Sequence, residues 1–273
     1  MKAIESISAY LFLMLFFAIS LFPFYWMFVI SSHTTSAVNH FPPLFTPGHL
    51  FGDNFSKVIK EIDFFKALWN TAAASGIATI LQLVFCSLAA FAFSYITFKG
   101  SKLLYVFIIS TMMIPSQLGL VPSYFIMTTF GWINSLKAII VPGLVSAYGV
   151  FWLKQYMEAA VHPHMLESAK IDGCSHFQTY YRIVVPIILP ALAALAILTF
   201  MGIWNEFVWA SLVLKSSDSQ TIQIALRNLS KVYYKDYAMI MAGTFAATIP
   251  LLLILAAFGR FFITGITAGA VKG

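Results

Sequence analysis

A compact polar stretch lies between two long apolar segments in the second half of the chain. It covers residues 166–186 and reads LESAKIDGCSHFQTYYRIVVP. Its ionisable side chains include Glu167, Lys170, Asp172 and Arg182. Charges of both signs on so short a segment can pair with a second protein. They do not form the paired acids or the nucleophile–base set that hydrolytic catalysis needs. If these groups carry a function, recognition of a partner is the chemistry that they can supply.

A second cluster could bind a polyhydroxylated ligand. Glu206 is the only carboxylate deep in an expected membrane span, and Trp204, Asn205 and Trp209 accompany it. A charge there costs about 2.5–3.5 kcal/mol on insertion scales and indicates function by default. Rings stack on sugar faces, and carboxylates accept hydroxyl hydrogen bonds. The alternative is that Glu206 lies near the outer interface and bonds a neighbouring helix. Weaker candidates are Asn70, Gln82, Gln117 and Gln155, for which joining helices is the favoured role.

The composition indicates that membrane helices position these residues. Of 273 residues, 60% are hydrophobic and 10% are charged, whereas soluble domains carry about 25% charged residues. Backbone groups in lipid must pair internally, so spans are helices or closed barrels. The apolar runs are continuous, which is typical of helices. The sequence therefore predicts an all-α, polytopic membrane protein with about six transmembrane helices.

The expected spans are separated by short polar or proline-containing connections. We place them at residues 10–30, 67–98, 103–128, 136–157, 183–214 and 237–263. The third should kink near Pro115 and Pro122. Lys and Arg divide evenly between the two sides, but the tight pair Lys99 and Lys102 favours a cytoplasmic N-terminus.

Local signals predict the shape of the polar stretch. Pro163 suits the first position of a helix, and Gly173 can adopt the left-handed geometry that ends it. Ser175 and Gln178 form a capping-box pattern that opens a second helix. A helix this short is marginal alone in water, so other groups must hold it. It is either a surface loop packed on its own span ends or a docking element for a cytoplasmic partner.

The same stretch carries a specific spacing. ESAKIDG, nine residues and then Ile183–Pro186 resemble the EAA loop of ABC importer permeases, whose pattern is Glu-Ala-Ala, three residues, Gly, nine residues and Ile-x-Leu-Pro. Ser168 replaces the first Ala and Val185 replaces the Leu. WNT at Trp69–Thr71, WNEF at Trp204–Phe207 and the terminal GRFFITGITAGAVKG resemble the maltose-type carbohydrate branch. The resemblance identifies the chain as one permease subunit of a sugar ABC importer.

The resemblance implies roles for individual residues. The whole chain, 1–273, would be one transmembrane permease domain with a cytoplasmic coupling loop at about 158–183. The residues that would dock on a separate ATPase subunit are Glu167, Ser168, Ala169, Asp172 and Gly173. Glu167 would pair with a basic residue of the ATPase. In the flexible tail, Gly269 and Lys272 would contact the ATPase pair.

The resemblance also implies the rest of a complex. A second permease subunit would complete a heterodimer, two ATPase subunits would supply energy, and an extracytoplasmic solute-binding protein would deliver the sugar. The sequence lacks a GxxxxGK[ST] loop, so we expect no cofactor in this chain, ATP and Mg on the ATPase, and no enzymatic activity of its own. We expect a multi-pass protein of a bacterial-type inner membrane, with both termini cytoplasmic and no nucleic-acid partner.

Three other functions would leave different features in the sequence. A membrane enzyme would need a catalytic residue set in the spans, and none is visible. A secondary transporter would show related halves or a chain of ionisable residues, whereas this sequence has one deep carboxylate and no repeat. An importer of glycerol phosphate-type solutes stays open within the same branch. Because no expected span contains an Arg or Lys cluster, neutral oligosaccharides are favoured.

Overall fold

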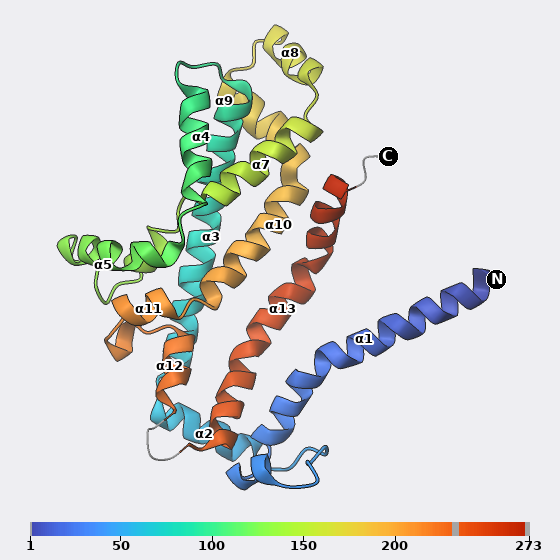
Figure 1. The fold of residues 1–273 in the computed structure, drawn as a ribbon, viewed down its shortest axis with the longest axis vertical. Helices are drawn as coiled ribbons and strands as arrows, with labels where there is room; N and C mark the ends of the chain where they lie inside the picture. Colours follow the sequence, from blue (N-terminus) through green and yellow to red (C-terminus); the bar gives the residue numbers. More distant parts are fainter. Residues whose placement is uncertain (1, 231–234, 271–273) are drawn as a thin grey trace. The chain divides into compact units, whose positions relative to one another are not determined.

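The computed structural model describes residues 2–230 and 235–270, and all elements within them are helical (Figure 1). This confirms the all-α, polytopic prediction. Four helices there are long and apolar enough to cross a membrane: Tyr10–Ser31, Phe64–Tyr95, His176–Trp204 and Tyr237–Ala257. A fifth results if the pair Ser101–Thr111 and Ser116–Thr129, bent by 95°, forms one broken span.

The elements follow one another as helices with short connections. Their bounds are α1 Lys2–Ser31, η1 Thr35–Asn39, α2 Phe51–Glu61, α3 Phe64–Tyr95, α4 Ser101–Thr111, η2 Ser116–Gly119, α5 Leu120–Thr129, α6 Lys137–Ile140, α7 Ala147–Ala160, α8 Pro163–Ile171, α9 His176–Thr179, η3 Tyr180–Val184, α10 Val185–Trp204, α11 Val208–Val213, η4 Ser217–Ser219, α12 Ile222–Asn228 and α13 Tyr237–Ala270. The last helix extends beyond the expected span end, through much of the tail expected to be flexible.

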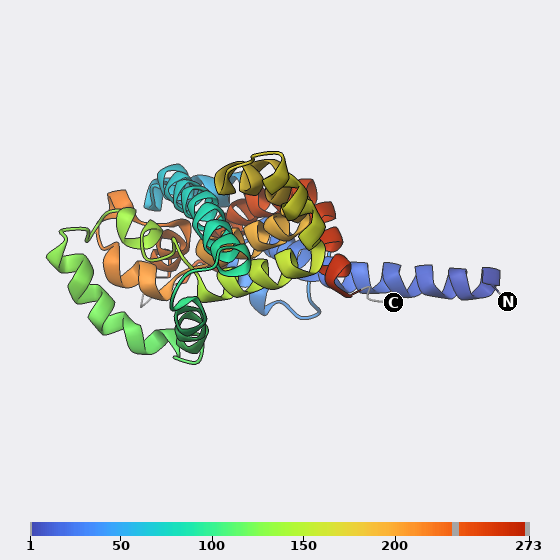
Figure 2. The same cartoon turned by 90° about the horizontal axis from the view of Figure 1, so that it is seen from above.

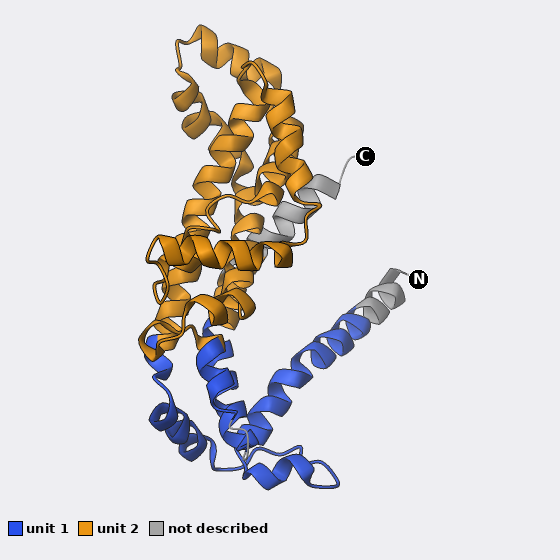
Figure 3. Cartoon of the chain, turned by 60° about the vertical axis from the view of Figure 1, so that its left-hand side comes forward, with its two compact units in different colours: residues 1–66, 224–250 blue, residues 67–223, 251–273 orange. Residues whose placement is uncertain are grey.

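The chain divides into two compact units (Figure 3). Unit 1 comprises Met1–Lys66 and Ile224–Pro250, and unit 2 comprises Ala67–Gln223 and Leu251–Gly273. Inside unit 1, three aromatic rings from α1, α2 and α13 cluster, because Phe28 lies 5.6 Å from Phe51 and 5.1 Å from Phe245 between ring centroids. Burying such rings stabilises the junction of these three helices.

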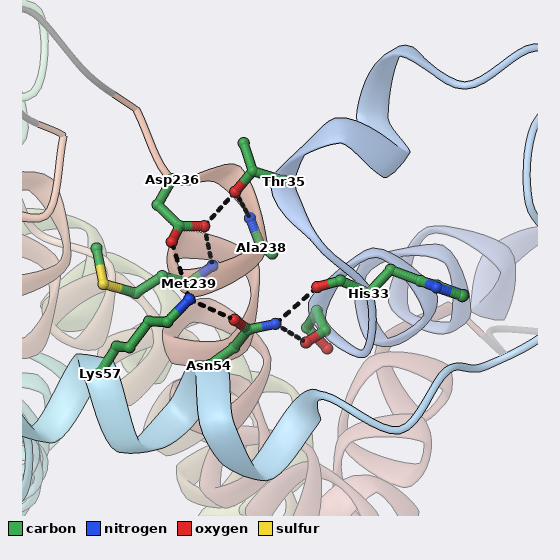
Figure 4. Close-up of polar contacts among 8 residues, drawn as sticks. His33, Thr35, Asn54, Lys57, Asp236, Ala238 and Met239 are labelled. Atoms are coloured by element: carbon green, nitrogen blue, oxygen red, sulfur yellow. Dashed lines mark hydrogen bonds and ion pairs between the residues drawn. The ribbon is translucent and has the colours of Figure 1, made fainter.

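A polar network joins the same three parts of unit 1 (Figure 4). Asp236 accepts hydrogen bonds from the Thr35 hydroxyl and, at 3.1 Å, from the Met239 N–H. Its other oxygen lies 3.3 Å from Lys57 Nζ, which also donates to Asn54 Oδ1 at 3.1 Å. Asp236 therefore caps the first turn of α13 and pairs with a cation on α2.

Two opposed effects set the pKa of Asp236. Burial of the carboxyl is the largest single effect, and it favours a higher pKa. Hydrogen bonds from Thr35, Met239 and Lys57, together with the Lys57 charge, outweigh it, so the pKa of Asp236 lies below its ordinary value. A carboxyl with a depressed folded-state pKa stabilises the fold fully above its unfolded-state pKa, about 3.9, and this stabilisation is lost as the pH falls through the folded-state pKa.

Asp236→Asn is expected to lower the melting temperature of the purified complex, because the cap and Lys57 lose the negative charge, at a cost of about 1–2 kcal/mol. Melting curves of both proteins should differ equally from about pH 5 to about pH 8 and begin to converge only below about pH 4, as the pH falls toward the folded-state pKa of Asp236. Asp53→Asn, which changes an exposed carboxylate of α2, is the matched control. A difference that changes between about pH 5 and about pH 8 would contradict the network's role.

Unit 2 is built around α3, α7 and α10, with α7 and α10 side by side (Figures 1 and 2). The centre is fully buried and includes Leu153, Val184 and Ile188. A Cβ on Gly149 would lie 3.0 Å from Cys86 Sγ, so the glycine lets α7 approach α3 closely. The core provides a rigid base for the connections at both ends of unit 2.

Three of the expected spans are interrupted within unit 2. The third breaks between α4 and η2, just before Pro115, instead of only kinking. The fourth, expected as one helix, consists of α6 and α7, with Pro142 and Gly143 in the turn between them. The fifth ends at Trp204, and α11 starts only at Val208. A proline removes one backbone donor and disfavours a helical residue before it, which accounts for the first two breaks.

Candidate functional site

Helix α8 lies at the end of unit 2 away from α5, α6 and α11 (Figure 1). Pro163 occupies its first turn, as predicted. It ends in a Schellman motif, because the Cys174 N–H donates to Ala169 O at 2.9 Å and the Gly173 N–H to Lys170 O at 3.2 Å. Gly173 has φ +76°, which confirms its predicted left-handed geometry. The predicted capping box of Ser175 is also present and opens α9.

The inner side of this loop is fixed to unit 2. Ala169 is buried. Where α9 leads into the next span, the π-helical turn η3 contains Tyr180, whose hydroxyl lies 2.6 Å from Ser87 Oγ on α3. The Tyr180 ring also contacts Phe91 at 5.5 Å between centroids. The end of the loop is therefore fixed to α3 as well as continuous with α10.

The outer side of α8 is free in this chain. The Glu167 side chain is 69% exposed, and its contact with His164 is long, at 3.4 Å. Asp172 is exposed, and Ser168 Oγ turns back to the His164 carbonyl at 2.9 Å. Ile171 is 86% exposed. Such an apolar side chain on a polar loop is the kind of group that a partner buries.

Ile171 was missed by the sequence reasoning. It stands directly before Asp172 and Gly173, and the signal was an aliphatic residue inside an otherwise polar helix end. The structure shows why it matters, since the neighbouring Ala169 faces inward and Ile171 outward. The predicted docking residues Glu167 to Gly173 thus form one short element that is held from inside and exposed outside.

A cavity of about 620 Å³ lies where the three interrupted spans of unit 2 meet. We call it the break cavity. Each break contributes to its wall, through Gln117 after the first, Gly143 in the second and Glu206 in the third. Its full lining is Ser116, Gln117, Gly119, Leu120, Ser123, Ile139, Pro142, Gly143, Gly202, Ile203, Glu206, Val208 and Trp209.

The candidates for substrate contact Trp204, Asn205, Glu206 and Asn70 do not gather in one place. Glu206 lines the break cavity, and its Oε1 accepts a hydrogen bond from the Trp209 N–H at 2.8 Å. Trp204 is buried, with 2% exposed. Asn205 bonds its own helix and Gln223. These two therefore have structural contacts and do not line the cavity.

Asn70 lies elsewhere in unit 2. Its amide donates to the carbonyls of Asp218 and Gln220, both at 3.0 Å, so it anchors the segment after α11. Of the tail residues, Gly269 belongs to α13, and Lys272 falls outside the described residues. Sequence reasoning gave Gln117 little weight and missed Ser116, Ser123 and Gly143, because only folding brings the three breaks together.

Comparison with known proteins decides the family. Residues 82–263 match the family model described as "Binding-protein-dependent transport system inner membrane component". The chain belongs to this family. The matched region includes both the α8 loop and the break cavity. The family assignment confirms the resemblance to ABC importer permeases drawn from the spacing of the loop, and it makes the chain a non-catalytic transport subunit of a multi-pass, inner-membrane type.

Relatives of similar length support the assignment. The lactose transport system permease protein LacG of Rhizobium radiobacter is 32% identical over 93% of this chain and 92% of its own length. The arabinooligosaccharides transport system permease protein AraQ of Halalkalibacterium halodurans is 31% identical over 84% and 82%. The trehalose/maltose transport system permease protein MalG of Thermococcus litoralis is 30% identical over 93% and 92%.

A solved structure shares the fold. One chain of a bacterial ABC transporter involved in the import of the acidic polysaccharide alginate superposes with a TM-score of 0.81 over 96% of this chain and 97% of that one, at 21% identity. Another crystal structure, of a bacterial alginate ABC transporter in complex with alginate pentasaccharide-bound periplasmic protein, gives 0.65 at 17% identity. At these identities the likeness concerns the fold alone.

Proposed function

We propose that this chain is one of two permease subunits of an ATP-driven importer of neutral oligosaccharides. The observation that carries the proposal is α8, a short helix fixed on its inner side by Ala169 and exposed on its outer side at Glu167 and Ile171. Three relatives named for sugar transport support the substrate class. The break cavity, among the described residues, has no Lys or Arg in its lining, which disfavours phosphorylated solutes.

In this proposal the energy comes from outside the chain. Two ATPase subunits bind ATP and Mg, and α8 docks in a cleft of one of them. Glu167 pairs with a basic residue of that ATPase, while Asp172 and Gly173 keep the turn compact. Closure of the ATPase dimer moves α8, and η3 passes the movement to α10 and α3, so that two bundles rock between inward and outward access.

The same proposal specifies the partners of the chain and its orientation in the membrane. The second permease subunit completes the path, an extracytoplasmic solute-binding protein delivers the sugar, and both termini and α8 are cytoplasmic. The tail around Gly269 and Lys272 contacts the ATPase pair. The chain spans a bacterial-type inner membrane as a single permease domain.

Purification of the chain from its own cells with an affinity tag tests this function. We expect a second permease and an ATP-hydrolysing subunit to co-purify, and proteoliposomes of this complex to take up sugar only with ATP inside and loaded binding protein outside. Uptake that proceeds on an ion gradient without ATP would indicate a secondary transporter and overturn the proposal.

A further inference from the structure

The break cavity has the properties of a site that meets the transported molecule. Irregular backbone at membrane depth is tolerated only where protein buries it or where it lines a water-filled cavity. In unit 2 the α6–α7 and α10–α11 breaks, together with the 3-10 turn η2 that follows the α4 break, contribute to one cavity wall. Its volume of about 620 Å³ is within the range of small-molecule sites, about 300–1,000 Å³.

The polar groups of this wall have unused hydrogen-bonding capacity. The Gln117 side chain is exposed and bonds no described residue. Glu206 uses Oε1 for the Trp209 N–H, and within residues 2–230 and 235–270 no donor reaches Oε2. Ser116 and Ser123 add two hydroxyls, and Gly143 leaves room for a ligand beside the backbone. Hydroxyl-rich molecules can satisfy such groups.

The charge of the cavity lining is of one sign. Glu206 is its single ionisable group, and no cation lies among the described lining residues. Lys137, two residues before the lining residue Ile139, is exposed and not part of the lining. Lys215 lies with Nζ 3.2 Å from the Tyr124 hydroxyl and over its ring. The carboxylate therefore gives the cavity a negative potential, which repels anions.

We propose that the break cavity is a sugar-contact site on the transport path of this subunit, water-filled between passages, in which Glu206 favours uncharged over anionic sugars. This deepens the proposed importer function and rests on it. Trp209 supplies an apolar wall, Gln117 and the serines bind hydroxyl groups, and Glu206 sets the charge preference. Glu206 is then a specificity-determining residue in addition to capping α11.

Thiol labelling of the complex in proteoliposomes tests the cavity directly. Gln117→Cys is made in a Cys86→Ala, Cys174→Ser background and treated with a trimethylammonium and a sulfonate methanethiosulfonate reagent. We expect both to react, the cation about tenfold faster than the anion relative to a small free thiol, and Glu206→Gln to remove most of this preference. Met113→Cys, which is exposed but outside the lining, should show no dependence on Glu206.

Uptake supplies the second readout. Sulfonate labelling of Gln117→Cys should reduce uptake from sugar-loaded binding protein at least about tenfold, since it fills the cavity with a second negative charge. An unreactive Gln117→Cys, a cation preference that survives Glu206→Gln, or full uptake after complete labelling would each overturn the site. Co-purification of the ATPase with these variants distinguishes failure of the site from failure of the proposed function, because loss of the ATPase from the complex would count against the importer function itself.

Discussion

Replacing Gly173 with valine is expected to abolish coupled transport while leaving the permease in the membrane. Gly173 has φ +76°, and no atom lies within 4 Å of the position that a Cβ would take. A β-branched residue there strains the backbone by about 1–3 kcal/mol and adds bulk on the side proposed to face the ATPase. ATPase co-purification and ATP-dependent uptake should both fall at least about tenfold, equivalent to about 1.4 kcal/mol of lost binding.

Two further variants separate strain from docking. Gly100 has φ +85° and equally open surroundings, so Gly100→Val carries the same backbone strain outside the α8 loop and should keep ATPase binding. Gly173→Asn tolerates the left-handed region but adds a side chain, and it should still impair docking. Equal losses in Gly100→Val and Gly173→Val would show that strain alone is responsible and that Gly173 has no contact role.

Replacing Glu167 with alanine is the second large effect that we expect. Its side chain is 69% exposed in this chain, with only a long contact to His164. Removing its carboxylate should therefore not destabilise the permease. At a buried interface, loss of one member of an ion pair costs about 2–5 kcal/mol. ATPase affinity for the purified permease pair should therefore fall at least about 30-fold, and sugar uptake should fall with it.

Glu158→Gln is the matched control. Glu158 lies at the start of the predicted coupling loop with its side chain 41% exposed, but it pairs within its own chain with Lys154 at 2.6 Å. Removing this charge should leave ATPase affinity nearly unchanged. If Glu167→Ala binds the ATPase as tightly as the parent protein, the carboxylate does not face a cation of the ATPase.

The sequence was sufficient for features that depend on local chemistry. Pro163, Gly173 and the Ser175 capping box each act within one helical turn, and all three are found as predicted. Continuous apolar runs likewise predicted helices of membrane length. The break cavity could not be read in the same way, because Gln117, Gly143 and Glu206 come from separate spans that meet only in the fold.

Asn70 and Ile171 are two further residues whose surroundings could not be predicted from the sequence. The Asn70 amide predicted a polar contact, either with substrate or, as favoured, between helices. The structure shows that its partners are the carbonyls of Asp218 and Gln220. For Ile171, an aliphatic residue at a polar helix end, the 86% exposure is evident only in the fold, where the neighbouring Ala169 is buried.

Photo-crosslinking from Ile171 tests the central claim most directly. A benzoylphenylalanine is placed at Ile171 in the intact complex in cells, and the same group at Phe41, a 90% exposed residue of unit 1, serves as comparison. The account predicts an adduct between position 171 and the ATP-hydrolysing subunit, and none from position 41 to that subunit. An adduct from position 171 only to an extracytoplasmic protein, or to none, would contradict it.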